Sequence, residues 1–281
     1  MSDEPHARRI DHDPSDVEVP HRQPGHLSGR ALVTNDDGID SPGLLCLARA
    51  VRRAGLAPLV VAPDRNVSGA GTGIGQLDVH EGVAFRTVER EGMDAHALAG
   101  PPGLAVLSAA LGAFGDAPDL VVSGINAGAN TGHSVIHSGT VGAALTGRTF
   151  GCSGLAVSLA PPRDDEPWRW DTAEEVAGEM CRWIIRLGRD DVVLNVNVPS
   201  VPTAAIRGFR WTELEAFGHI RVASADHAGR RVEFGVHGDV EDRSPTSDHR
   251  LLADGWVTVT ALTTVAQAQP LGPDLPAFVT H

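Results

Sequence analysis

Short apolar runs alternate with helical patterns along the first 200 residues, and most runs end at a polar or glycine-rich loop. The runs at 31–35 and 57–63 predict buried strands. Between them, residues 44–55 carry apolar positions at helical spacing, and Gly55 is placed to end that helix. A strand, a helix and a second strand within about 30 residues are typical of a parallel sheet.

The alternation continues and then changes character near residue 205. Helices are predicted at 102–114, 140–151 and 172–188, and extended segments at 79–98, 118–124, 154–160 and 192–202. Beyond them, the segments at 207–224 and 230–238 read as antiparallel β-structure, 241–255 as a polar connection and 256–265 as a strand. We expect an α/β fold, with a mostly parallel sheet, flanking helices and a C-terminal β-rich arm.

This pattern divides the chain into three parts. We expect a disordered leader at 1–28, because it is polar and rich in Asp, His and Pro. An α/β domain should occupy 29–204, and a β-rich extension should occupy 205–281.

Composition excludes several classes of function. A formal net charge of −13 argues against a protein that coats a nucleic-acid polymer. No apolar run approaches the roughly 20 residues that cross a bilayer, and residues 1–25 lack the apolar centre of a signal peptide. Cys46, Cys152 and Cys181 are scattered, which argues against disulfides or a zinc site and favours the cytoplasm.

Four polar loops carry the candidate chemistry. Three follow predicted strands, at 35–38, 64–69 and 123–130, and the fourth, 137–140, opens a helix. Because the carboxyl ends of parallel strands meet at one edge of a sheet, where such folds bind ligands, we expect the four loops to converge.

The adjacent carboxylates of Asp36 and Asp37 repel each other unless a cation lies between them or one of them takes up a proton. A hard divalent ion such as Mg²⁺ or Mn²⁺ prefers oxygen ligands, and Ser68 and Asn126 would add neutral ones. The start of the helix at Ser138, Gly139 and Thr140 offers free N–H groups and a positive dipole end, which suit a phosphate.

Each motif has a structural alternative. An Asp-Asp-Gly sequence is commonly a turn, and the glycine-rich loops are commonly turns as well. Ser138 or Thr140 can instead cap the helix by accepting hydrogen bonds from backbone N–H groups. His137 is either a proton donor or a packed surface histidine.

Four stretches of this sequence resemble the SurE family of survival proteins in order and spacing, and the likeness covers roughly residues 30 to 265. The segments that carry it are TNDDGIDSPGL, VVAPDRNVSGAG, PDLVVSGINAGANTG and VIHSGTVGAAL. The resemblance implies a divalent-metal-dependent phosphatase acting on nucleoside 5′- and 3′-monophosphates. It also implies that 29–204 form a Rossmann-like catalytic domain. Residues 205–281 would then be a β-rich oligomerisation arm, exchanged within a homodimer or homotetramer, whose final strand returns to the core.

The resemblance assigns roles to individual residues, and its four metal ligands are those that the chemistry had already selected. It implies one divalent metal, Mg²⁺ or Mn²⁺, per subunit, bound by Asp36, Asp37, Ser68 and Asn126. Asp36, Asp37 and Asn126 would be catalytic, with one of the aspartates accepting the proton of the attacking water. The phosphate or substrate would be bound by Asn35, Gly69, Asn130, Ser138, Gly139 and Thr140.

The sequence departs from the family pattern outside the metal centre. Residues 100–105 read GPPGLA in place of the usual Gly-Thr-Pro-x-Asp-Cys, His137 replaces a tyrosine, His133-Ser134 replaces an acidic pair, and 265–267 lacks the usual Asp-Leu-Thr. These changes leave open a specialised biosynthetic phosphatase with a non-nucleotide substrate. A nucleotide-binding transferase and a non-catalytic assembly module are further alternatives. The partner expected is a phosphorylated small molecule, with neither membrane nor nucleic-acid polymer.

Overall fold

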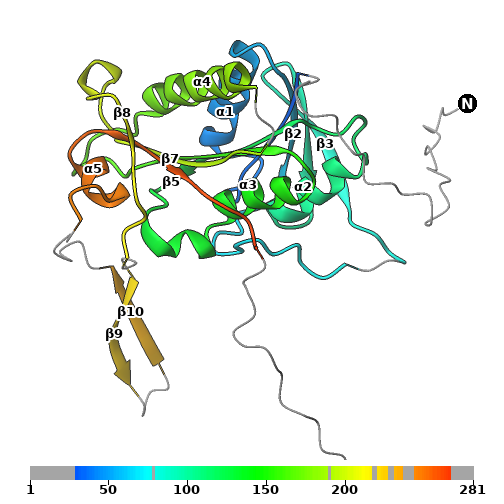
Figure 1. Ribbon diagram of the computed structural model, residues 1–281. Coiled ribbons are helices and arrows are strands. Elements are labelled where there is room, and N and C mark those ends of the chain that lie inside the picture. The colour runs from blue at the N-terminus through cyan, green and yellow to red at the C-terminus, as the bar shows by residue number, and fades with distance from the viewer. Residues whose placement is uncertain are drawn as a thin grey trace, which may run out of the picture.

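The protein is described by a computed structural model that covers residues 29–77, 80–188, 191–216, 220–226, 231–236 and 244–266. The predicted leader at 1–28 lies outside the described residues, as do parts of the predicted arm. Figure 1 shows helices on both sides of a long sheet and a separate two-stranded ribbon, β9–β10.

The strands and helices follow one another as the α/β pattern predicts. The strands are β1 (Arg30–Thr34), β2 (Ala57–Pro63), β3 (Phe85–Arg90), β4 (Met93–Leu98), β5 (Leu120–Ala127), β6 (Ser153–Leu159), β7 (Val193–Val198), β8 (Phe209–Trp211), β9 (Ile220–Asp226), β10 (Arg231–Val236) and β11 (Val257–Ala261). The helices are α1 (Pro42–Arg53), α2 (Pro102–Ala110), α3 (Gly139–Thr149), α4 (Trp170–Leu187) and α5 (Asp248–Ala253), with short 3₁₀ turns η2 (Gly132–His137) and η3 (Thr203–Ala205).

Nine strands form one sheet in the order β3-β4-β2-β1-β5-β6-β7-β11-β8. The six strands from β4 to β7 are parallel, which confirms the predicted α/β class. The chain runs outward from β1 to β2 and later returns to add β5 on the other side of β1. The loops after β1, β2 and β5 therefore leave neighbouring carboxyl ends, at the kind of switch point where open α/β sheets bind ligands.

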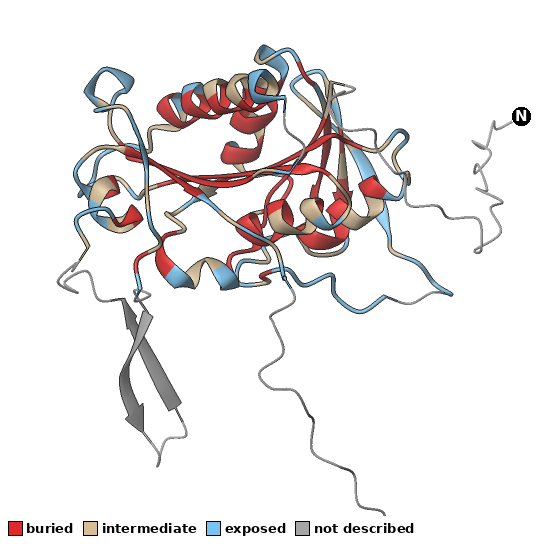
Figure 2. Ribbon diagram, viewed as in Figure 1, coloured by how far each residue is buried: buried red, intermediate tan, exposed pale blue. Residues whose placement is uncertain are grey.

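A separate apolar core lies on each face of the sheet. Helices α1 and α4 pack together on one face, and α2 and α3 pack together on the other (Figure 1). Leu44, Leu47 and Val51 of α1 recur at helical spacing and are fully buried. Figure 2 shows the central strands buried along their length, as expected for parallel strands covered on both sides.

Helix α3 is rich in small residues, and its neighbours approach it very closely. A Cβ added to Gly142 would lie 2.1 Å from the carbonyl oxygen of Gly71, in the loop that follows β2. One added to Gly154 of β6 would lie 2.5 Å from the carbonyl oxygen of Ala144. Real Cβ atoms do not tolerate such distances, so glycine at these positions brings the β2 loop and β6 against α3.

Two of the local predictions were wrong. The segment at 209–211 was expected in antiparallel structure, but β8 runs parallel to β11 at the edge of the main sheet. The partner of an edge strand lies far away in the sequence, so local periodicity does not reveal its direction. The predicted polar connection at 241–255 contains helix α5, which begins where the Ser247 hydroxyl accepts a hydrogen bond from the N–H of Arg250.

Candidate functional site

The turn after β1 is closed by the side chain of Asn35. This buried amide donates from Nδ2 to the carbonyl oxygen of Gly38 and accepts from the Gly38 N–H at Oδ1, both at 3.1 Å. Gly38 has φ +102°, and a Cβ there would lie 3.0 Å from the carbonyl carbon of Arg65. Asn35 thus shapes the turn that presents the two aspartates.

Asp36 is buried and held by the start of α3. The residue is only 3% exposed, and its Oδ1 accepts a 2.5 Å hydrogen bond from the Thr140 hydroxyl. A Cβ added to Gly139 would lie 2.8 Å from Asp36 Oδ2, so only glycine lets the helix approach the carboxylate this closely. Thr140 was predicted to bind phosphate through its N–H group, and its hydroxyl has a separate role in orienting Asp36.

Asp37 is partly buried and links the loops after β2 and β5. Its Oδ1 accepts from Nδ2 of Asn66, and its Oδ2 accepts from the N–H of Ala127, both at a long 3.3 Å. Burial raises the pKa of the Asp37 carboxyl and the negative charge of Asp36 raises it further, while the Ala127 N–H lowers it in part. The contribution of Asp36, the smaller of the two that raise the pKa, reflects two like charges held close together.

Ser68 and Asn126 are brought to the same place through these contacts. The Ser68 hydroxyl donates to Oδ1 of Asn66 at 2.9 Å, so Asn66 connects Ser68 to Asp37. Asn126 lies at a register shift in β5 and donates its Nδ2 to the carbonyl oxygen of Gly128 at 2.7 Å, which directs its Oδ1 elsewhere. The four predicted metal ligands thus belong to one connected group of loops.

The start of α3 supplies backbone donors beside this group. The Ser138 hydroxyl accepts a hydrogen bond from the N–H of Val141 at 3.1 Å. Ser138 therefore caps the helix, which was the structural alternative to phosphate binding. The backbone N–H groups of Gly139 and Thr140 donate to no acceptor among the described residues. These two donors remain available to an anion.

Asn130 anchors the loop after β5. Its backbone N–H donates to Asn197 Oδ1 and its Nδ2 donates to the Ser158 hydroxyl, both at 2.8 Å. Its carbonyl oxygen accepts from the amides of Asn195 and Asn197. Gly69, the remaining predicted residue, is exposed with φ +87° and has open space beside it.

Sequence reasoning missed two residues, Asn66 and Asp248. The buried Asp248 carboxylate accepts hydrogen bonds from the backbone N–H groups of Gly132, Glu215 and His249, at 2.8, 3.0 and 2.8 Å. Burial raises the pKa of this carboxyl, although these three donors partly oppose the shift. Asp248 therefore connects the loop after β5 to the segment preceding β9. In the sequence, only the Ser-Asp pair at the start of α5 indicated locally that a helix begins at this position.

The oxygen atoms at this edge of the sheet fit a hard divalent cation. Two carboxylates, an amide oxygen and a hydroxyl are the ligand types that Mg²⁺ and Mn²⁺ accept. No three His, Cys, Asp or Glu side chains gather as a metal centre within the described residues. A metal at Asp36 and Asp37 would therefore depend on Ser68 and Asn126 to complete its protein ligands.

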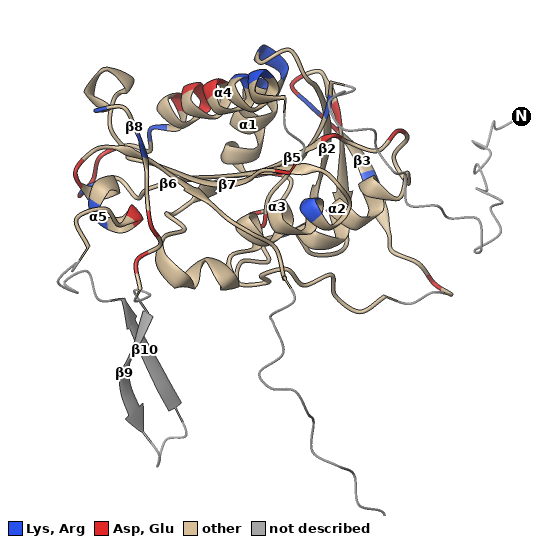
Figure 3. Cartoon of the chain, in the orientation of Figure 1, with Lys and Arg blue, Asp and Glu red and all other residues tan. Residues whose placement is uncertain are grey.

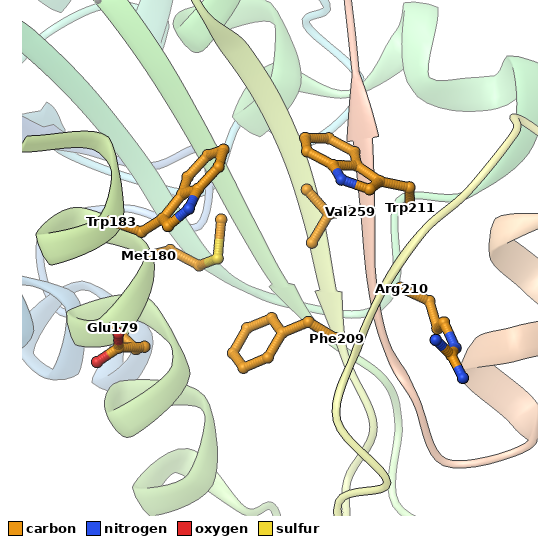
Figure 4. Close-up of a pocket in the computed structure, with 7 residues that line it drawn as sticks. All are labelled: Glu179, Met180, Trp183, Phe209, Arg210, Trp211 and Val259. Carbon is orange, nitrogen blue, oxygen red and sulfur yellow. The ribbon is translucent and has the colours of Figure 1, made fainter. Parts of the chain in front are cut away.

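An apolar pocket of about 310 Å³ lies elsewhere, between α4 and the edge of the sheet (Figure 4). Met180 and Trp183 of α4 face Phe209 and Trp211 of β8 across it, and the rings of Trp183 and Trp211 lie 6.1 Å apart. None of the predicted site residues lines it. No helix in the described part of the chain combines the length and apolarity needed to cross a bilayer.

The fold and the site define a doubly wound α/β protein with an acidic, oxygen-rich site at the carboxyl edge of its sheet, beside a helix N-terminus. Comparison with known proteins identifies the class more closely. The family described as Survival protein SurE matches residues 31–218. This chain belongs to the SurE family.

Curated relatives and a solved structure extend the match over most of the chain. The 5′-nucleotidase SurE of Xanthomonas campestris pv. campestris (strain B100) is 39% identical over 240 residues, covering 83% of this chain and 89% of the relative. The 5′-nucleotidase SurE of Stenotrophomonas maltophilia (strain K279a) is 38% identical with the same coverage. The crystal structure of the SurE protein from Aquifex aeolicus matches with a TM-score of 0.69 at 29% identity, covering 83% of this chain and 93% of that one.

Proposed function

We propose that this protein is a divalent-metal-dependent phosphomonoesterase that hydrolyses nucleoside 5′- or 3′-monophosphates. The observation that carries the proposal is the Asp36–Asp37 pair, whose like charges are held together beside free helix N–H groups. The names of the curated relatives support a nucleotide substrate. No observation favours the specialised phosphatase, the transferase or the assembly module over this function.

In the proposed reaction, Asp36, Asp37, Ser68 and Asn126 hold one Mg²⁺ or Mn²⁺. When bound, the metal supplies Lewis-acid stabilisation of the phosphoryl group and a more acidic water. The carboxylate pair accepts the proton of the attacking water. The N–H groups of Gly139 and Thr140 donate to the phosphoryl oxygens, where negative charge accumulates in the transition state.

The proposal also covers the cellular compartment, the oligomeric state and the roles of the two parts of the chain. We place it in the cytoplasm, because Cys46, Cys152 and Cys181 are buried and form no disulfide, as in a reducing compartment. We also propose that residues 205–281 act as an arm in a homodimer or homotetramer, while 29–204 form the catalytic domain.

The test is phosphate release from AMP, 3′-AMP and p-nitrophenyl phosphate. The protein is assayed as purified, after EDTA treatment, and after Mn²⁺ or Mg²⁺ is restored. We expect hydrolysis that EDTA abolishes and the metal restores, with AMP or 3′-AMP preferred. Hydrolysis that is indifferent to EDTA, or no hydrolysis with any metal, would rule the proposal out.

A further inference from the structure

Asn66 lies between two of the proposed metal ligands and contacts both. Its Nδ2 donates to Oδ1 of Asp37 at 3.3 Å. Its Oδ1 accepts from the backbone N–H of Ser68 at 3.0 Å and from the Ser68 hydroxyl at 2.9 Å. Asp37 and Asn66 are separated by 29 positions in the sequence, so this one side chain joins the loop after β1 to the loop after β2.

The hydrogen-bond partners fix the orientation of the Asn66 amide. The Ser68 N–H can only donate, so it requires the amide oxygen, and the Asp37 carboxylate requires the NH₂ group. The Ser68 hydroxyl in turn points its proton at Asn66. Its lone pairs are therefore directed away from Asn66, where they can accept a cation.

Asn66 is exposed, so burial does not explain its three hydrogen bonds. Hydrogen bonds of an exposed side chain contribute little to the stability of the fold, because water can replace them. Their consequence is local, since they fix where the Asp37 carboxylate lies relative to the Ser68 hydroxyl. On the other side of Asp37, the Ala127 N–H fixes the carboxylate relative to β5.

We propose that Asn66 is a positioning residue that holds Asp37 and Ser68 in the arrangement a divalent cation requires, so that metal affinity depends on it. This inference rests on the proposed function, because it assumes a metal bound by Asp37 and Ser68. Partners of metal ligands of this kind typically change metal affinity by about 10- to 100-fold when they are removed. Asn66 itself is not a ligand and does not touch the substrate.

Two substitutions separate positioning from a simple turn. Asn66→Ala removes all three hydrogen bonds. Asn66→Ser keeps a short acceptor that can bond the Ser68 N–H within the turn, but its side chain does not reach Asp37. A residue needed only for the turn would tolerate serine, whereas a residue that links the two ligands would not.

The experiment is isothermal titration of the full-length wild-type protein and both variants with Mn²⁺, together with p-nitrophenyl phosphate hydrolysis at increasing Mn²⁺. We expect both variants to bind Mn²⁺ roughly 10-fold or more weakly than wild type. At saturating Mn²⁺, KM and kcat should return to near the wild-type values, and the melting temperatures should be unchanged.

Two results would overturn the inference while the proposed function stands: Mn²⁺ binding equal in all three proteins, or wild-type affinity in Asn66→Ser with weak binding in Asn66→Ala. In either case the wild type would still bind Mn²⁺ and hydrolyse the ester. If the wild type neither bound Mn²⁺ nor released phosphate, the proposed function would fail first, and the role of Asn66 would fail with it.

Discussion

Two of the regions that hold a carboxylate out of solvent, the contact between α1 and α4 and the loop after β1, treat its charge in opposite ways. Glu174 of α4 is buried, and it is ion-paired with Arg49 at 2.7 Å and with Arg53 of α1. Figure 3 shows basic segments of α1 beside acidic segments of α4. Burial alone would raise the pKa of Glu174, but the hydrogen bonds and charge of Arg49, with Arg53, lower it below its ordinary value.

Asp36 and Asp37 receive no such compensation. Among the described residues, no Arg side chain forms an ion pair with either aspartate. Burial raises the pKa of Asp37, and the negative charge of Asp36 raises it further. The Glu174 carboxylate thus has arginine partners from the chain, whereas the Asp36–Asp37 pair has none among the described residues. Under the proposed function, a divalent cation from solution would take their place.

Removing Asp37 should have the largest effect on activity, because the proposed function makes it a metal ligand. We expect Asp37→Ala to lower phosphatase activity by roughly 10³-fold, corresponding to a few kcal/mol of transition-state stabilisation. The melting temperature should not fall, since the substitution relieves repulsion from Asp36. The control is Asp94→Asn, an exposed carboxylate of β4, which should keep full activity. Full activity in Asp37→Ala would break the comparison.

Thr140→Val tests whether the start of α3 orients Asp36. The substitution keeps the shape of the side chain but removes the hydroxyl that donates to Asp36 Oδ1. We expect roughly a 10- to 100-fold loss of Mn²⁺ affinity, measured by titration. Thr146→Val on the same helix removes a hydroxyl that bonds only the Gly142 carbonyl oxygen, and it should leave Mn²⁺ binding intact. Equal affinities in the two variants would assign Thr140 no part in holding the carboxylate.

Glu174→Gln tests how much the ion-paired carboxylate contributes to the stability of the fold. Because the folded-state pKa of Glu174 is lowered, its charge contributes stability above its ordinary value of 4.5, and this contribution is lost as pH falls through the folded pKa. We expect the variant to lose about 2 kcal/mol of unfolding free energy at pH 7 and to converge with wild type below pH 4.5. Denaturant unfolding at several pH values measures this difference.

Glu179→Gln is the matched control for that series. Glu179 lies on the same helix and pairs with Arg182 and Arg186, but its side chain is 46% exposed. Exposed pairs contribute little, so its substitution should change stability by well under about 1 kcal/mol. If the two variants lost equal stability, burial would not distinguish the two ion pairs.

Ser138→Ala has the smallest expected effect, and it separates capping from phosphate binding. Loss of the bond to the Val141 N–H should cost about 1 kcal/mol of stability. Ser247→Ala, which removes the equivalent cap of α5, should cost a similar amount. We expect only Ser138→Ala to raise KM for the phosphate ester. An unchanged KM would leave Ser138 as a cap alone.

The α/β class was predictable because strand and helix periodicities are local, and the loops at the carboxyl edge followed from that class. The adjacent charges of Asp36 and Asp37 were informative because they are also local: two consecutive residues are enough to show that the two carboxylates repel each other. The direction of β8 was not predictable, because its partner β11 begins 46 residues after β8 ends (257 − 211).

The contacts that shape the site were also beyond the sequence. Asn35 closes its own turn, Thr140 bonds Asp36, and Asn66 joins Asp37 to Ser68. Thr140 and Asp36 are 104 positions apart, and only the folded sheet brings them together. A polar residue in a loop has no local signal that distinguishes a ligand from the residue that holds a ligand in place.

The most direct test of a metal site at this edge is an anomalous difference map from crystals soaked in Mn²⁺. We predict one peak per chain, about 2.0–2.6 Å from oxygens of Asp36, Asp37, Ser68 and Asn126. A map with no peak between these side chains, or with its peak at another place in the molecule, would contradict the metal-dependent phosphatase proposed here.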